Sequence, residues 1–284
     1  MNQLINFIEL TRMNKPIGIF LLLWPTLIAL WVAQQGIPDI RILSIFILGT
    51  IVMRSAGCIA NDLADRNIDG YVERTKNRPL ASKKITIHLA LAYLLVLLLV
   101  AFFLVLQLNL LTIKLSFLAA LSAIIYPFTK RFFAIPQLML GTSFGFGILM
   151  AFTAIQAQIP PEAWALFIAN LFWALGYDSH YAIHDMKDDQ KASIHSSALS
   201  FKHYTIPVIA FSFVLMYCIL IFIGYQNKYL MQFYILMAIS ATIALKGVVK
   251  GISMDPHENF KAFLSNNYVG FFMFMAFVSQ MLEF

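Results

Sequence analysis

Nine long apolar stretches constrain the fold of this chain more than any other feature. Each is close to the roughly 20 apolar residues that an α-helix needs to cross a hydrocarbon core of about 30 Å. They show no alternation of polar and apolar residues over ten-residue blocks, which argues against a transmembrane β-barrel. The sequence therefore predicts an all-α integral membrane protein with nine transmembrane helices, in a single domain over residues 1–284. The stretches are residues 16–34, 42–60, 86–107, 110–128, 134–155, 163–182, 205–225, 229–250 and 263–282.

Composition supports this fold class. The chain is 60% apolar and only 12% charged, whereas about a quarter of the residues of a soluble domain are charged. A surface that faces lipid carries charge only at a high energetic cost. The first stretch is too long for a cleavable signal peptide and follows no Arg/Ser-rich leader, so we expect a bacterial inner membrane. Cys58 and Cys218 lie inside apolar stretches, where we expect small packing residues and neither a disulfide nor a metal site.

The basic residues predict the orientation in the membrane. If the N-terminus is cytoplasmic, the cytoplasmic segments hold 17 of the 20 Lys and Arg, and only Arg41, Lys114 and Lys228 lie on the other side. This is the asymmetry that the positive-inside rule describes. The net charge of +6 is thus a topology signal and not a sign of nucleic-acid binding, and the C-terminus is expected in the periplasm. Two long cytoplasmic loops, about 61–85 and 183–204, contrast with short connections on the other side, and long loops of this kind are usually functional.

Two acidic clusters lie at the cytoplasmic ends of the second and sixth stretches. Like charges on one helical face repel each other, and a bound cation removes that repulsion. Mg²⁺ prefers oxygen ligands and commonly combines one or two carboxylates with substrate phosphates. We therefore expect a diphosphate held by metal ions between the clusters; the alternative is an ordinary solvated acidic loop. The clusters are Asp62, Asp65, Asp69 and Glu73, and Asp178, Asp185, Asp188 and Asp189. Nearby cations that could complete the neutralisation are Arg66, Arg74, Arg78, Lys130, Arg131, Lys187 and Lys191.

The first cluster belongs to a recognisable motif. Residues 61–69 read NDLADRNID, an NDxxDxxxD pattern, and the second cluster contains DxxxD at residues 185–189. This resembles the UbiA superfamily of intramembrane prenyltransferases. Further strings, NKPIG at 14–18, LWPT at 23–26 and NNYVG at 266–270, narrow the resemblance to the branch that prenylates 4-hydroxybenzoate in ubiquinone biosynthesis.

The resemblance implies a fold, a reaction and a set of site residues. The fold is a UbiA-type bundle of nine transmembrane helices around a central cavity, with the active site at the cytoplasmic side. The substrates are a polyprenyl diphosphate and 4-hydroxybenzoate, and the cofactor is Mg²⁺. The implied metal ligands are Asn61, Asp62, Asp65, Asp185 and Asp189. The implied catalytic residues are Asp69 together with the four aspartates of that metal site. The implied substrate-binding residues are Tyr126, Lys130 and Asp178. Arg66 is a further substrate-binding candidate because of its charge next to the first cluster.

The second motif departs from the pattern of the branch. Met186, Ser193 and His195 stand where Arg, Gly and Lys are usual. The carboxylates are intact, but the expected diphosphate-binding cation is missing at its usual place. Lys187 and Lys191 are the candidate replacements.

Arg54 is a separate candidate that follows from helix geometry. It precedes Asn61 by seven residues, which places it two turns deeper, about 10 Å from the metal site, on nearly the same helical face. An arginine at that depth needs a partner or a wet cavity, and its planar fork suits a carboxylate. We assign it to the carboxylate of 4-hydroxybenzoate; the alternative is that it extends to the cytoplasmic surface.

Other interpretations are weaker. His180 and His184 have an i, i+4 spacing that can bind zinc on a helix, but they point away from the acidic stripe and no third ligand is near. A transporter would place its acids near the membrane midplane between broken helices, whereas these acids lie at one interface. A sister prenyltransferase with another aromatic acceptor stays open as the closer alternative.

Overall fold

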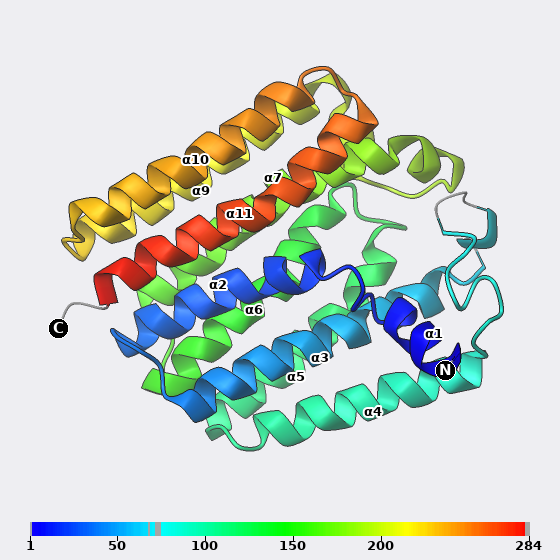
Figure 1. Cartoon of the computed structure of the whole chain (residues 1–284), viewed down its shortest axis with the longest axis horizontal. Helices are drawn as coiled ribbons and strands as arrows, with labels where there is room; N and C mark the ends of the chain where they lie inside the picture. Colours follow the sequence, from blue (N-terminus) through cyan, green and yellow to red (C-terminus); the bar gives the residue numbers. More distant parts are fainter. Residues whose placement is uncertain (1, 68, 72–74, 282–284) are drawn as a thin grey trace.

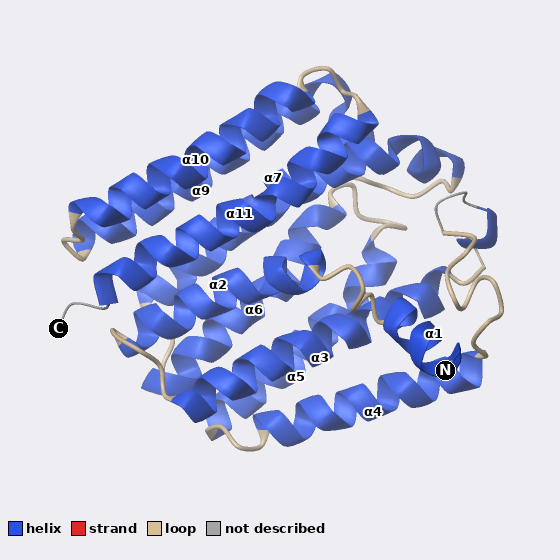
Figure 2. Cartoon of the chain, in the orientation of Figure 1, coloured by secondary structure: helices blue, strands red, loops and turns tan. Residues whose placement is uncertain are grey.

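The computed structural model describes residues 2–67, 69–71 and 75–281, and within these ranges all regular secondary structure is helical (Figure 2). Nine helices in the described part of the chain have 18 residues or more, as predicted. Eight of them are long and apolar enough to cross a membrane. The ninth, α7, has 31 residues, is packed against α6, α9 and α11, and carries the second acidic cluster. The long helices are α2 (Ile17–Gln34), α3 (Ile40–Asp65), α4 (Ile87–Val105), α5 (Leu110–Thr129), α6 (Pro136–Gln156), α7 (Pro161–Lys191), α9 (Thr205–Gln226), α10 (Met231–Gly251) and α11 (Pro256–Met281).

The long helices lie side by side and span the molecule from one end to the other (Figure 1). One end carries the short helices α1 (Asn2–Leu10) and α8 (Ser197–Phe201), the 3₁₀ turns Asp69–Tyr71 and Lys202–Tyr204, and the segments on either side of them. We call it the motif end, because the helix ends and turns that carry the acidic clusters lie there. The C-terminal end of α11 lies at the opposite end of the bundle (Figure 1).

Side-chain caps fix where several helices begin. Asp39 accepts hydrogen bonds from the backbone N–H groups of Arg41 (2.9 Å) and Ile42 (3.2 Å) at the start of α3. Asn109 accepts one from the N–H of Thr112 (3.0 Å) at the start of α5. Such caps satisfy N–H groups that have no partner inside the helix. They explain why these connections between helices are short.

Three helices extend beyond the predicted spans, which corrects the loop boundaries. Helix α3 continues to Asp65 and α7 to Lys191, so the predicted loops 61–85 and 183–204 are shorter and the acids at 62, 65, 185 and 189 are helical. No Pro or Gly interrupts either helix there, and the backbone turns only at Ser193, with a φ of 53°. Helix α11 begins at Pro256 and not near 263. Its first turns are polar, so apolar length alone could not reveal them.

The main core is formed chiefly by α2, α6, α7, α9, α10 and α11, with Phe152, Trp173 and Phe277 fully buried. Leu10 of α1 belongs to a second apolar cluster shared with α3 and α4, which ties α1 to the motif end of α3. Helices α4 and α5 are the least buried of the spans. Their outward apolar side chains, such as Phe103 and Phe117, are suited to lipid.

Candidate active site

A cavity of about 390 Å³ lies between α2, α3, α4, α5 and α6. Arg54 and Asn61 of α3 and Tyr126 of α5 line it together with mainly apolar side chains. These three predicted site residues come from two helices, and Asn61 and Tyr126 are 65 positions apart in the sequence. The structure therefore brings a half-buried guanidinium, an amide and a phenol to one apolar cavity.

Asp62 is fully buried and is held by two arginines. Arg12 forms a bidentate pair with it, with Nη2 at 2.6 Å from Oδ1 and Nη1 at 3.3 Å from Oδ2. Arg78 Nη1 lies 3.3 Å from the same Oδ1. A buried carboxylate needs such compensation, because an unpaired charge in the interior is very costly. The motif end thus already concentrates positive charge at a predicted metal ligand.

Arg12 is the site residue that the sequence did not single out. It follows α1 with a φ of 60° and also donates to the backbone carbonyls of Glu9 and Leu10. The turn directs its guanidinium at α3, fifty residues further along the chain. A basic residue just before the first apolar stretch is also expected from topology alone, so the sequence carried no separate signal for this role.

Asp69 lies outside α3, in the 3₁₀ turn Asp69–Tyr71, so it does not continue the helical stripe of Asp62 and Asp65. Arg78 links the 3₁₀ turn to α3. Its Nη1 lies 3.0 and 2.8 Å from the two carboxylate oxygens of Asp69 and also contacts Asp62. Burial raises the pKa of Asp69, and the Arg78 guanidinium partly opposes this rise. Glu73 and Arg74 lie outside the described residues.

Lys130 interacts electrostatically with residues of both acidic clusters. It follows the last residue of α5. Burial by itself lowers the pKa of Lys130, but the opposing charges of Tyr126, Asp189, Asp178 and Asp65 raise it above the ordinary value. These groups come from α3, α5 and α7, so Lys130 is within electrostatic reach of both clusters. Its backbone carbonyl accepts a hydrogen bond from the N–H of His195 (2.7 Å), which ties the segment after α7 to the end of α5.

The remaining predicted residues differ in exposure. Asp185 of α7 is buried, whereas Asp178 and Asp189 are half-buried. Lys187 and Lys191 are exposed on the last turns of the same helix. Their predicted role as replacement cations for the diphosphate stays a prediction. Arg66 is also exposed, and its Nη1 donates to the carbonyl of Leu63 (2.9 Å).

Arg54 packs directly over Gly18 of α2. A Cβ atom at Gly18 would lie 2.4 Å from Arg54 Nε and 2.5 Å from Nη2, so only glycine leaves room for the guanidinium in this position. Arg54 Nε is buried and has no hydrogen-bond partner among the described residues. A buried donor of this kind is expected to be satisfied by a ligand or by water. The glycine of the NKPIG string thus has a physical role beside Arg54.

The LWPT and NNYVG strings pack against each other. Trp24 Nε1 donates to Asn267 Oδ1 (2.9 Å), and Trp173 Nε1 donates to Asn266 Oδ1 (3.0 Å). A Cβ at Gly270 would lie 2.4 Å from Trp24 and 2.7 Å from Trp173. These strings therefore join α2, α7 and α11 into one unit, which is a structural role.

The two histidines of α7 face α11. His180 is buried with Nδ1 at 2.7 Å from Asn259 Oδ1, and His184 Nδ1 lies 3.2 Å from the carbonyl of Pro256. In the described part of the chain, no group of three or more His, Cys, Asp or Glu is arranged to hold a metal ion. This holds for the acidic clusters as well as for the histidines, so a cation at the acidic clusters needs further ligands from a substrate. Cys58 and Cys218 are both free thiols.

The donor set at the motif end suits a hard cation that shares its coordination with a substrate. It consists of carboxylates and one amide, with Asp62 already in contact with positive charge. Mg²⁺ is usually bound by one or two carboxylates together with substrate phosphates, and not by an all-protein cage. The ligand atoms of these residues therefore suit Mg²⁺, provided that phosphate oxygens of the substrate complete its coordination shell.

Comparisons with known proteins give the family and the fold of this chain. Residues 22–278 match the UbiA prenyltransferase family. A 4-hydroxybenzoate octaprenyltransferase of Nitrosomonas eutropha is 49% identical over 270 residues, which cover 94% of this chain and 94% of that protein. An apo structure of a UbiA homolog from Aeropyrum pernix K1 has the same fold, with a TM-score of 0.81 at 20% identity over 93% of this chain and 98% of that one. A UbiA homolog from Archaeoglobus fulgidus, solved with GPP and Mg²⁺ bound, gives a TM-score of 0.70 at 15% identity over 96% and 99% of the two chains.

Proposed function

The chain belongs to the UbiA prenyltransferase family, and we propose that it transfers a polyprenyl group from an allylic polyprenyl diphosphate to the 3-position of 4-hydroxybenzoate, releasing diphosphate. The reaction belongs to ubiquinone biosynthesis. The relative from Nitrosomonas eutropha, named for an octaprenyl transfer to this acceptor, supports both the donor and the acceptor.

One observation carries the proposal. Lys130 lies within electrostatic reach of Asp65 on one side and of Asp178 and Asp189 on the other. Two acidic clusters around one lysine form a site for a diphosphate and its counter-ions, because the lysine pairs with phosphate oxygens while the acids hold the cations. The adjoining apolar cavity with Arg54 and Tyr126 offers the space for an aromatic acceptor.

We propose Mg²⁺ as the cofactor, held by Asn61, Asp62 and Asp65 on one side and by Asp185 and Asp189 on the other. Bound there, the ion would neutralise charge that develops on the departing diphosphate. Asp62 must release Arg12, at least in part, to serve as a ligand. Asp69 contributes through Arg78, which it shares with Asp62.

The chain's own residues would perform three tasks. Arg54 binds the carboxylate of 4-hydroxybenzoate with its planar fork, which orients the ring in the cavity. Lys130 and Tyr126 hold the diphosphate at the mouth of the cavity. The apolar walls exclude water, so the allylic carbocation meets the electron-rich aromatic carbon beside the phenol before it meets solvent.

The positive-inside rule supports an orientation in a bacterial inner membrane. Three basic residues are exceptions: Arg41 lies near the start of α3, Lys114 near the start of α5, and Lys228 just after α9. These helix ends lie at the opposite end of the bundle from the motif end (Figure 1). We therefore infer that the motif end and the N-terminus are cytoplasmic and that the C-terminus is periplasmic.

The acceptor is tested with purified membranes, geranyl diphosphate and Mg²⁺, by supplying 4-hydroxybenzoate or homogentisate in parallel. We expect 3-prenyl-4-hydroxybenzoate from the first acceptor and little product from the second. Product from homogentisate alone would identify the chain as a sister enzyme. Binding of the diphosphate without transfer to either acceptor would contradict the proposed reaction.

A further inference from the structure

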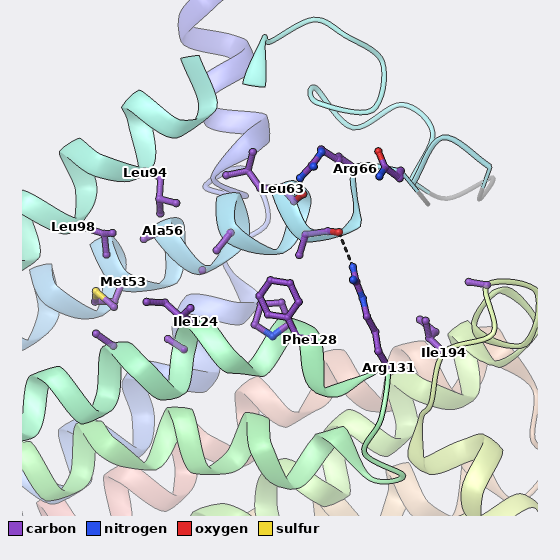
Figure 3. A pocket seen from close by; sticks show the side chains of 18 of the residues that line it. Met53, Ala56, Leu63, Arg66, Leu94, Leu98, Ile124, Phe128, Arg131 and Ile194 are labelled. Atoms are coloured by element: carbon purple, nitrogen blue, oxygen red, sulfur yellow. Dashed lines mark hydrogen bonds between the residues drawn. The ribbon is translucent and has the colours of Figure 1, made fainter. Parts of the chain in front are cut away.

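A second and larger hollow lies outside the cavity, between α3, α4 and α5 (Figure 3). Its volume is about 920 Å³. Part of its wall is shared with the inner cavity, including Met53, Leu98 and Ile124. We call it the outer groove. It borders α4 and α5, the two least buried spans, and therefore lies on the side of the bundle that lipid surrounds.

The deep part of the outer groove is apolar. Met53, Leu94, Leu98, Ile124 and Phe128 point into it in Figure 3. Its described lining residues include no Asp, Glu, Lys or His. Apolar surface of this extent on a soluble protein would need a partner. Next to a membrane, a hydrocarbon chain is the fitting occupant.

The only charged side chains among the described lining residues are two arginines at the motif end of the groove, Arg66 and Arg131. Arg131 Nη2 donates to the carbonyl of Ala64 (2.8 Å), and its guanidinium carbon lies 5.4 Å from the centroid of the Phe128 ring. Arg66 Nη1 donates to the carbonyl of Leu63. A guanidinium has five N–H donors. The one hydrogen bond that each arginine makes within the described part of the chain therefore leaves most of its donors for an anion.

We propose that the outer groove binds an anionic phospholipid of the cytoplasmic leaflet, with its phosphate between Arg66 and Arg131 and an acyl chain along the apolar wall. Basic pockets between transmembrane helices on the cytoplasmic side characteristically bind anionic headgroups. Two arginines with no acidic residue among the described lining residues can bind the negative charge of a phosphodiester without a metal ion. A prenyl diphosphate carries more charge and is served by the acidic clusters, which lie around Lys130 and not in this groove.

The groove also has a direct connection to the active site. Ala64, whose carbonyl binds Arg131, adjoins Asp65 of the first cluster. On the other rim, Ile194 adjoins His195, whose N–H binds the carbonyl of Lys130 (Figure 3). A lipid seated on this rim touches segments next to both acidic clusters. We therefore expect bound phospholipid to stabilise the motif end.

The test is lipid binding by the purified full-length protein in detergent. Native mass spectrometry and thermal unfolding are recorded after addition of phosphatidylglycerol or phosphatidylcholine with the same acyl chains. We expect one phosphatidylglycerol to be retained at least fivefold more often than phosphatidylcholine, and a rise in the unfolding temperature with phosphatidylglycerol alone. Arg66→Gln/Arg131→Gln is expected to lose both effects. The control Lys246→Gln/Lys250→Gln removes two exposed lysines outside the groove and is expected to keep them.

Three results would overturn the proposal: equal retention of the two lipids, an unchanged preference in the arginine double variant, or displacement of phosphatidylglycerol by geranyl diphosphate without metal. The last would identify the groove as a donor site. If the double variant does not fold, Arg66→Gln alone decides, because among the described residues this exposed side chain bonds to one carbonyl, that of Leu63 in its own helix. A weakened preference in that variant supports the site, and a preference equal to that of the unmodified chain refutes it.

Discussion

Replacing Gly18 by alanine tests the role of Arg54 without altering Arg54 itself. The new Cβ would lie 2.4 Å from Arg54 Nε and 2.8 Å from Cζ. Ordinary contacts between carbon atoms are about 3.5–4.0 Å, so the guanidinium must move by about 1 Å or more. It is the far end of a flexible side chain, and Ala is a better helix former than Gly by up to about 1 kcal/mol. The fold should therefore persist while the position of the guanidinium changes.

The size of the effect follows from what the guanidinium is proposed to bind. Hydrogen bonds to a charged partner contribute about 1.5–3 kcal/mol each. Loss of one such bond to the carboxylate of 4-hydroxybenzoate corresponds to a KM increase of roughly 10- to 150-fold. The diphosphate is held by other residues, so the KM for the prenyl donor should change by less than about twofold.

The assay is steady-state prenylation with each substrate varied in turn, together with thermal unfolding in detergent. Gly36→Ala is the matched control, because nothing lies within 4 Å of a Cβ at Gly36, at the opposite end of the bundle. A folded Gly18→Ala protein with an unchanged KM for 4-hydroxybenzoate would refute the assignment of Arg54. Equal increases in both KM values would show that the substitution disturbs the whole site.

Three other predictions concern the same end of the molecule and its supports. Arg78→Ala leaves the carboxylate of Asp69 without its charged partner and should destabilise the fold by about 3 kcal/mol in chemical denaturation. Lys84→Ala removes an exposed ion pair with Glu9 at 3.9 Å and should cost less than about 1 kcal/mol; equal losses would contradict the bridging role of Arg78. Gly270→Ala forces a Cβ against the rigid indole rings of Trp24 and Trp173 and should lower the stability of the fold by about 1–3 kcal/mol. An unchanged unfolding temperature would show that the LWPT string of α2 and the NNYVG string of α11 do not pack as described. Lys130→Gln should raise the KM for the prenyl diphosphate roughly tenfold or more, with little change in the KM for the aromatic acceptor. An increase in the KM for the acceptor alone would show that Lys130 does not bind the diphosphate.

Most of the fold could be predicted because membrane thickness sets the length of each helix. The predicted stretch 110–128 became α5, Leu110–Thr129, since apolar length and the cap at Asn109 agree. Helix α11 was predicted too short because its first turns, from Pro256, face the motif end and are polar. Apolar length identifies the part of a helix inside lipid and gives no measure of the part that continues beyond it.

The candidate site was predictable in its acids and less so in their partners. The spacing of Asp62 and Asp65 is local and visible in the sequence. The pairing of Asp62 with Arg12 depends on how α1 packs on α3 through Leu10, which no local pattern encodes. The same holds for Gly18, whose contact with Arg54 joins two separate helices.

The central claim is that both acidic clusters act on one diphosphate through a metal ion. The most direct measurement is formation of 3-prenyl-4-hydroxybenzoate from geranyl diphosphate, with Mg²⁺ or with EDTA, by the unmodified chain and by Asp62→Asn and Asp185→Asn. We expect product only with the metal, and its loss in both variants while the proteins remain folded. Full activity in EDTA, or in either folded variant with Mg²⁺, would contradict the account.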